Sequence, residues 1–202
     1  MEEHKKRPLQ IGITGGIGSG KSVVCKIFSC LQISIYEADS RAKWLTNNNQ
    51  EIREKVINLL GEKSYNSEGL YDSPYVASLV FKDEILLKKL NAIIHPVVMD
   101  DTEKWVLDKS GAIYVIKEAA IMNKAGDGNN LDYVIVVQAP VDLRIKRILY
   151  RDNRRKEEIR AIIERQISDE DRNKIADFVI NNDETSAIIP QVLKLHQLFL
   201  NK

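Results

Sequence analysis

One eight-residue run, Gly15 to Ser22, holds four of the ten glycines in the chain and constrains its fold more than any other feature. The run reads GGIGSGKS, which fits the pattern GxxxxGK[ST]. Apolar residues precede it as in a buried strand and follow it at helical spacing: Leu9, Ile11 and Ile13 before, and Val23, Val24, Ile27, Phe28 and Leu31 after. A strand, a glycine loop and a helix in this order predict a phosphate-binding loop.

The chemistry of this loop points to a nucleoside triphosphate. Glycines let successive backbone N–H groups point at phosphate oxygens, and the following helix adds its positive N-terminal end. Lys21 is expected to reach the β- and γ-phosphates, and the Ser22 hydroxyl is expected to bind Mg²⁺. The residues predicted to contact the nucleotide are Gly15, Gly16, Ile17, Gly18, Ser19, Gly20, Lys21, Ser22 and Val23. The simpler alternative is a glycine turn that precedes a lysine by chance.

Length and charge exclude several classes of protein. With 202 residues the chain can bury a substantial core. A composition of 44% hydrophobic and 29% charged residues is typical of soluble proteins. A net charge of +1 argues against a general nucleic-acid-binding protein, and no run approaches the roughly 20 apolar residues of a membrane span. Residues 1–8 form a polar tail without an apolar signal core, so we expect a cytoplasmic protein.

Neither the cysteines nor the histidines suggest a metal site. Cys25 and Cys30 are five residues apart in the predicted first helix, which turns them to different faces. We therefore expect no disulfide or metal pair and interpret both cysteines as packing residues. The three histidines, His4, His95 and His196, are too scattered to predict a zinc site.

Strand-like apolar runs alternate with helical patterns, which favours an α/β fold with a doubly wound sheet. The five predicted strands are Leu9–Thr14, Ile33–Tyr36, Ala112–Lys117, Tyr133–Gln138 and Asp177–Asn181. Most lack period-two alternation, as expected for parallel strands that are buried on both faces. Five strands with the phosphate loop after the first is the layout of small P-loop kinases, so residues 9–202 are expected to form one such domain.

Two long segments interrupt this pattern. The first, about residues 40–110, is too long for a simple crossover, and we interpret it as a helical acceptor-binding insertion. Its predicted helices are Glu51–Leu60, Pro74–Phe81, Asp83–Ile94 and Val97–Asp108, with turn residues at 61–72. The second, about residues 147–170, is rich in arginine and lies between the fourth and fifth strands, where a lid is expected.

Two carboxylates, Glu37 and Asp39, follow the second predicted strand. The end of this strand in a doubly wound sheet lies beside the phosphate loop, at the edge where ligands bind. A carboxylate there can accept the proton of an attacking hydroxyl, and we interpret Asp39 as this catalytic base. Alternate residues of an extended chain face the same side, so Glu37 could point to the same place. The alternative for either residue is a cap on the next helix.

Glu118 and His95 each have a functional and a structural interpretation. Glu118 ends the third strand region, where P-loop enzymes place acids near Mg²⁺ or its waters, but it could equally form a surface pair with Lys117. His95 precedes Pro96, which we expect to end a helix. A lone histidine at such a break is more often structural than catalytic.

Arg147 and Arg151 are four residues apart, which puts them on one face of the helix after the fourth strand. Arginine near the expected nucleotide can stack on a base or bind the transferred phosphate, so both are predicted to contact the nucleotide. Other lid charges, such as Arg155 and Glu158, lie at spacings that allow ordinary helical ion pairs on a solvated face.

Taken together, these motifs resemble the dephospho-coenzyme A kinase family. The ITGGIGSGKS sequence at residues 13–22 is more similar to the loop of that family than to a generic phosphate loop, and Tyr36–Asp39 resembles its DAD element. Further matches run in order along the chain: Val80-Phe81, His95-Pro96, Arg147, Arg151-Asp152, Gln166, Ala176-Asp177 and Ile180-Asn181-Asn182. The loop alone fits many kinases, whereas the ordered set from Leu9 to about His196 separates this family from them.

The resemblance implies a P-loop kinase core with a helical acceptor-binding domain and a lid. It implies transfer of the ATP γ-phosphate to the ribose 3′-hydroxyl of dephospho-coenzyme A, which is the last step of coenzyme A synthesis. The expected catalytic residues are then Asp39, which matches the family's base, and Lys21, with Mg²⁺ as cofactor. Asp39, His95 and Glu118 are the expected acceptor-side residues, and no nucleic-acid or membrane partner is expected.

Four positions depart from the family pattern. The first acid of the DAD element is Glu37, and Lys124 replaces the acid that ends the element after the third strand. Ser73 and Ile162 stand where the family usually has arginine. These departures concern the acceptor site more than the ATP site.

Two other classes of function fit the phosphate loop alone. A nucleoside or nucleotide kinase would need an acceptor site that reads a base, and residues 40–110 contain no such pattern. A nucleotide-dependent switch protein would need segments that respond to the γ-phosphate. The sequence Asn123-Lys124-Ala125-Gly126 begins like an NKxD guanine-binding motif but lacks its aspartate.

Overall fold

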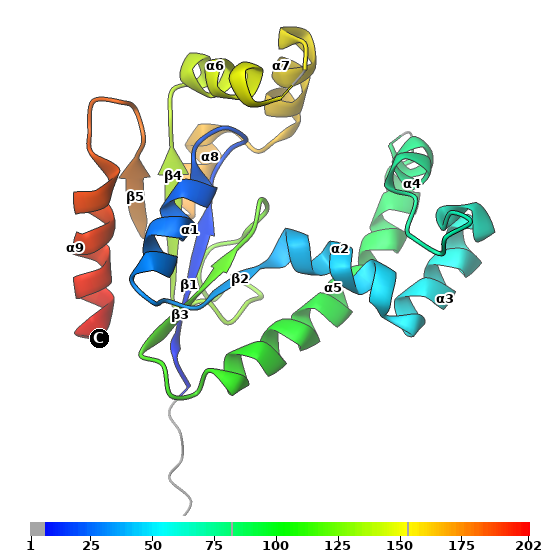
Figure 1. The fold of residues 1–202 in the computed structure, drawn as a ribbon, viewed down its shortest axis with the longest axis horizontal. Coiled ribbons are helices and arrows are strands. Elements are labelled where there is room, and N and C mark those ends of the chain that lie inside the picture. Colours follow the sequence, from blue (N-terminus) through cyan, green and yellow to red (C-terminus); the bar gives the residue numbers. More distant parts are fainter. Residues whose placement is uncertain (1–6, 82, 153) are drawn as a thin grey trace, which may run out of the picture. The chain divides into compact units, whose positions relative to one another are not determined.

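The computed structural model describes residues 7–81, 83–152 and 154–202. The chain divides into two compact units, and each is described by itself. The first, here called the core unit, contains the chain up to Glu37 and from Lys109 onward. The second, the helical unit, spans Ala38–Asp108. Figure 1 labels the elements of both units.

A five-stranded parallel sheet in the order β2-β3-β1-β4-β5 forms the centre of the core unit. Its strands are β1 (Leu9–Thr14), β2 (Ile35–Glu37), β3 (Tyr114–Glu118), β4 (Tyr133–Gln138) and β5 (Phe178–Asn181). The predicted α/β class and all five strands are confirmed, although β2 and β3 begin two residues later than expected. Because β1 lies between β3 and β4, the loop after it emerges at the middle of the carboxyl edge.

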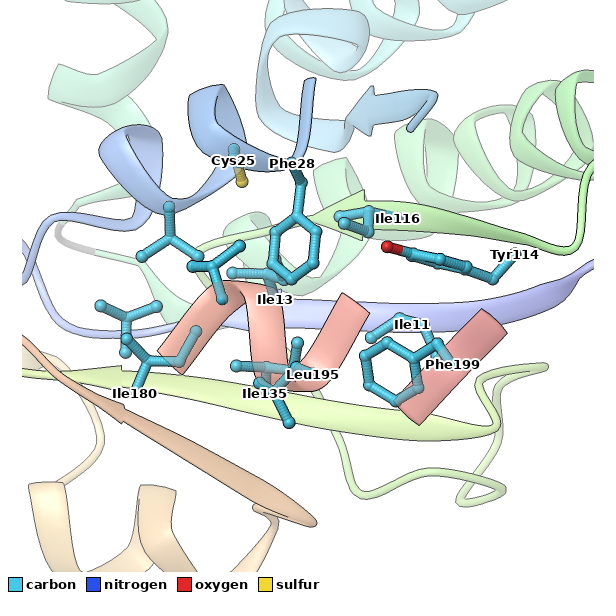
Figure 2. Close-up of a cluster of buried hydrophobic side chains, with 13 residues drawn as sticks. Ile11, Ile13, Cys25, Phe28, Tyr114, Ile116, Ile135, Ile180, Leu195 and Phe199 are labelled. Carbon is cyan, nitrogen blue, oxygen red and sulfur yellow. The ribbon is translucent and has the colours of Figure 1, made fainter. Parts of the chain in front are cut away.

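The helices of the core unit are α1 (Lys21–Cys30), α6 (Val141–Arg151), α7 (Lys156–Arg165), α8 (Asp169–Lys174) and α9 (Ile188–Leu200). Helices α1, α8 and α9 contact the strands, whereas α6 and α7 pack on each other and on Ile17 of the loop. On one face, Phe28 of α1 and Phe199 of α9 pack with the strand residues around Ile13, as Figure 2 shows. Alternate β4 residues, such as Val134, pack on the other face against Met122 and Ile175. Burial on both faces explains why the strands show no period-two alternation.

The two cysteines are free thiols and lie in different surroundings. Cys25 lies in the buried cluster of Figure 2, and burial raises the pKa of its thiol to about 12. Cys30 is exposed, so its interpretation as a packing residue was wrong. Five residues rotate the helix by about 500°, which is about 140° past one full turn, and this directs Cys30 away from the face that Cys25 buries.

The helical unit has a hydrophobic core of its own. Its elements are α2 (Ala38–Asn48), α3 (Gln50–Leu60), the 3₁₀ turn η1 (Glu62–Ser64), α4 (Ser73–Val80) and α5 (Glu84–Asp108). The buried cluster consists of Leu45, Ile52, Val56, Leu60, Tyr65, Val76 and Leu90. The predictions for α3 and α4 are confirmed to within a residue. Helix α2 was missed, because only Ala38, Leu45 and Thr46 of its eleven residues are buried and the periodic signal is weak.

Helix α5 corrects a second expectation, namely that Pro96 ends a helix. Residues predicted as two helices, 83–94 and 97–108, form one helix of 25 residues with Pro96 inside it. Proline removes a backbone donor and crowds the preceding turn. Buried residues on both sides of the proline, Leu90 before it and Thr102 and Val106 after it, anchor the helix, so packing overrides the local preference.

Within the described residues, no helix has both the length and the apolar character that crossing a bilayer requires.

Candidate functional site

The phosphate loop, residues 15–22, connects the central strand β1 to helix α1. Gly20 has a φ of 99° and adopts the left-handed conformation that begins α1. A Cβ at Gly20 would also overlap the side-chain amide of Asn182, which donates a 2.8 Å hydrogen bond to the carbonyl of Ser19. Within the loop, the N–H of Ser19 donates to the carbonyl of Gly16 at 3.1 Å. The glycines are therefore required by the backbone conformation and by the packing behind the loop.

Lys21 and Glu118 lie together at the carboxyl edge of the sheet. The Lys21 ammonium donates a 2.9 Å hydrogen bond to the carbonyl of Gly15, and its nitrogen is 3.9 Å from a Glu118 carboxylate oxygen. Both side chains are about 15% exposed, so the pair is only partly screened by water. Glu118 ends β3, and Glu37 is its partner in the register between β2 and β3. Two carboxylates thus end neighbouring strands beside the phosphate loop.

A cavity of about 240 Å³ separates the phosphate loop from helix α6. It is lined by Gly16, Ile17, Gly18, Gly20, Lys21, Ser22, Val23, Arg147, Ile148 and Arg151. The prediction that Arg147 and Arg151 share a helix face near the loop is confirmed. Two guanidinium groups and one ammonium line the same cavity, which suits a polyanionic ligand.

Both arginines of this cavity are held by neighbouring residues. The Nη2 atom of Arg147 lies 3.1 Å from both the carbonyl and the side-chain oxygen of Asn182, and 3.6 Å from Glu184. Its Nη1 atom is buried without a hydrogen-bond partner in the described part of the chain. Arg151 pairs with Asp152 at 2.8 Å, and this hydrogen bond raises the pKa of Arg151.

Arg155 and Glu158 form the ordinary ion pair that was the simpler alternative for these residues. Arg155 pairs with Glu158 at 2.9 Å on the exposed surface of α7. Such exposed pairs contribute little to stability.

Asp39 and His95 belong to the helical unit. Helix α2 begins at Ala38, so Asp39 is an exposed residue of its first turn, and the expectation of an extended chain from Glu37 to Asp39 was wrong. His95 is exposed on α5, within the helix and not at its end. Of the departures from the family pattern, Ser73 begins α4, Lys124 is exposed and Ile162 is half-buried in α7.

The sequence patterns did not reveal the two side chains that hydrogen-bond to the backbone of Ile17 in the loop. The N–H of Ile17 donates to Gln166 and its carbonyl accepts from Nε of Arg144, both at 2.9 Å. Gln166 entered only as a family match, and Arg144 did not enter at all. The partners are 149 and 127 residues apart along the chain, a separation that no local pattern can reveal.

Comparisons with known proteins identify the family of the chain. The family model described as dephospho-CoA kinase matches residues 9–187. The chain belongs to the dephospho-CoA kinase family. Its members are kinases, and P-loop kinases bind the phosphate donor with a loop of this kind.

Two curated relatives and two solved structures illustrate the match. The dephospho-CoA kinase of Bacteroides fragilis (strain YCH46) is 35% identical over 187 residues, covering 93% of this chain and 91% of the relative. That of Porphyromonas gingivalis (strain ATCC BAA-308 / W83) is 36% identical over 191 residues, covering 93% and 92%. The Thermus thermophilus protein TT1252 superposes with a TM-score of 0.81 at 28% identity, covering 97% of this chain and 98% of the other. The Campylobacter jejuni dephospho-CoA kinase has a TM-score of 0.61 at 24% identity, covering 96% and 98%, and shares the fold.

Proposed function

We propose that this protein transfers the γ-phosphate of ATP to the ribose 3′-hydroxyl of dephospho-coenzyme A, giving coenzyme A and ADP. One observation supports the part of this proposal that concerns ATP binding: the phosphate loop, Arg147 and Arg151 line a single cavity. The acceptor half rests on family membership, because the relatives named above are dephospho-CoA kinases.

The donor phosphates would be held by the loop amides and by Lys21. Phosphoryl transfer needs little covalent help from the protein, so positioning and charge stabilisation supply most of the catalysis. Lys21 is only 14% exposed, and an ammonium in such a place stabilises developing phosphate charge better than a solvated one. Arg147 and Arg151, from the proposed lid at about residues 147–170, would cover the nucleotide from the other side of the cavity.

Mg²⁺ is the proposed cofactor, and the residues present fit it. In the described residues no group of three His, Cys, Asp or Glu side chains could hold a metal ion alone. Mg²⁺ in kinases is usually bound by one or two protein ligands together with substrate phosphates, so a sparse protein donor set is the expected one. Ser22, exposed in the cavity, would supply a hydroxyl, and Glu37 and Glu118 end adjacent strands where they can bind metal-held waters. The ion would neutralise charge on the transferred phosphate.

Asp39 is the proposed catalytic base. It is exposed and lies two residues after Glu37, the last residue of β2. A carboxylate that is free of deep burial can accept the proton of the 3′-hydroxyl as the hydroxyl oxygen attacks phosphorus. We further propose that the helical unit, with His95 on α5, binds the acceptor.

The decisive experiment incubates the protein with ATP, Mg²⁺ and dephospho-coenzyme A, and follows products by mass spectrometry. Coenzyme A and ADP should form in equal amounts, and chelation of the metal with EDTA should stop both. Release of ADP without coenzyme A, or release that needs a nucleoside or another acceptor, would overturn the assignment. We also propose a cytoplasmic location, where ATP is available, which fractionation of the source cells would test.

A further inference from the structure

Two arginines of the core unit are almost completely buried, although arginine is rarely so. The exposed fractions of Arg144 and Arg172 are 2% and 3%. Both guanidinium groups bind the same carboxylate, that of Asp169 in the first turn of α8. Arg144 reaches both oxygens of Asp169 at 3.1 Å, and Arg172 also donates to the carbonyl of Ile167 at 2.9 Å. We call these three residues the arginine–aspartate cluster.

The cluster is joined directly to the tip of the phosphate loop. Arg144 donates from Nε to the carbonyl of Ile17 at 2.9 Å, and its guanidinium fills the space where a Cβ on Gly16 would lie. On the other side, Gln166 accepts the N–H of Ile17 at 2.9 Å. The backbone N–H and the backbone carbonyl of Ile17 are therefore both hydrogen-bonded to side chains that are distant in the sequence.

The two contacts on Ile17 come from elements on either side of the lid helix α7. Arg144 belongs to α6, which precedes α7, whereas Gln166 and Asp169 follow it. The ion pair between Arg144 and Asp169 joins α6 to the first turn of α8. The segment from 166 to 169 is thus connected to Ile17 of the loop through hydrogen bonds and an ion pair.

The charge balance of the cluster makes Asp169 its critical member. Two buried cations share one carboxylate that is itself 47% exposed. Burial lowers the pKa of Arg144, and Asp169 opposes this effect whereas Arg172 adds to it. In addition, Nε of Arg172 is buried without a hydrogen-bond partner among the described residues. Neutralising Asp169 would leave two like charges uncompensated behind the loop.

We propose that Arg144, Asp169 and Arg172 are positioning residues for the phosphate donor. They fix the backbone of Gly16 and Ile17 in the conformation in which the loop amides receive ATP. None of the three lines the 240 Å³ cavity, so their effect on that cavity passes through the loop. This inference rests on the proposed function of the loop as the ATP site.

A positioning role predicts a specific kinetic pattern. Asp169→Asn and Arg144→Gln should each raise KM for ATP about 10-fold or more, because one lost charge-assisted hydrogen bond has an effect of this size. KM for the acceptor should stay within twofold of the parent value. The double variant Asp169→Asn/Arg144→Gln should be less impaired than the product of the single effects, because it removes the carboxylate together with one of its two cations.

Glu170→Gln is the matched control. It removes one negative charge from the next residue of α8, whose side chain is exposed. Its KM for ATP should remain at the parent value, which separates the arginine–aspartate cluster from a general effect of charge on α8. Asp169→Glu, which restores the carboxylate, should recover much of the lost affinity.

Thermal unfolding and ATP titration complete the test. If Arg144→Gln does not fold, Asp169→Asn decides alone, since Asp169 is half-exposed and its replacement is nearly isosteric. Equal increases in both KM values, single effects that multiply, or a fall in the melting temperature with unchanged kinetics would overturn the inference. An inactive parent protein would instead refute the proposed function, so the two failures are distinguishable.

Discussion

The side-chain nitrogen of Lys21 lies 3.9 Å from a carboxylate oxygen of Glu118, across the boundary between the phosphate loop and strand β3. The same nitrogen donates to the carbonyl of Gly15 at 2.9 Å. The carboxylate and the carbonyl hold the ammonium over the loop, which reduces the ordering that ATP binding must supply. Glu118 ends β3 next to Ile13 of β1, and Lys21 begins α1 after the loop that leaves β1, so the pairing of these two strands brings the side chains together.

Replacement of Lys21 by methionine should lower kcat by about 10²-fold or more, because one preorganised donor to developing phosphate charge has an effect of that order. The variant should keep its fold, since methionine fills a similar volume. Lys26→Met provides the control, as Lys26 is exposed on the same helix α1. Comparable losses in both variants would mean that Lys21 acts only through the net charge of the helix.

Asp39→Asn should retain ATP binding and lose most turnover, by about 10² to 10⁴-fold, the range for removal of a general base. The comparison variant is Asp100→Asn, which neutralises another exposed carboxylate of the helical unit. Binding of ATP by calorimetry and kcat by coupled ADP release would be measured for both. A near-normal kcat in Asp39→Asn would exclude this residue as the base.

Arg147→Ala should raise KM for ATP about 10-fold through loss of a charge-assisted contact at the cavity. Arg151→Ala should have a smaller effect, because Arg151 is the more exposed of the two and is already paired with Asp152. Arg160→Ala removes an exposed arginine of α7 that lies outside the cavity lining, and its KM for ATP should not change. The same increase in all three variants would point to bulk charge and would contradict specific contacts.

The parts of this site that are local in sequence could be predicted, and the parts that are distant could not. The loop from Gly15 to Ser22 and the pair Arg147 and Arg151 follow from backbone conformation and helical spacing. Arg144 could not be predicted, because its partners Ile17 and Asp169 lie on other elements and its burial depends on the assembled core unit. Alternation and helical period define elements, whereas the contacts between elements depend on the tertiary fold.

Pro96 shows that tertiary contacts also limit the prediction of secondary structure from sequence. Its replacement has a predictable effect. Pro96→Ala should increase the free energy of unfolding by about 2 kcal/mol, because an internal proline costs about 3 kcal/mol while its stiffening of the unfolded chain returns up to about 1 kcal/mol. Pro74→Ala, in the first turn of α4, should change stability much less. Urea unfolding followed by circular dichroism measures both variants, and a destabilised Pro96→Ala would show that the proline is adapted to its site.

Cys25 and Cys30 should differ sharply in reactivity, because the thiolate is the reactive form. Burial raises the pKa of Cys25 from about 9 to about 12, so at pH 8 its thiol stays protonated and shielded. Iodoacetamide should therefore add once to the folded protein, at the exposed Cys30, and twice in urea. The Cys30→Ser variant should remain unmodified when folded, and a native adduct on Cys25 would contradict its burial. Since the folded pKa lies above the unfolded one, the stability that the protonated thiol contributes is complete below pH 9 and declines as the pH rises toward 12.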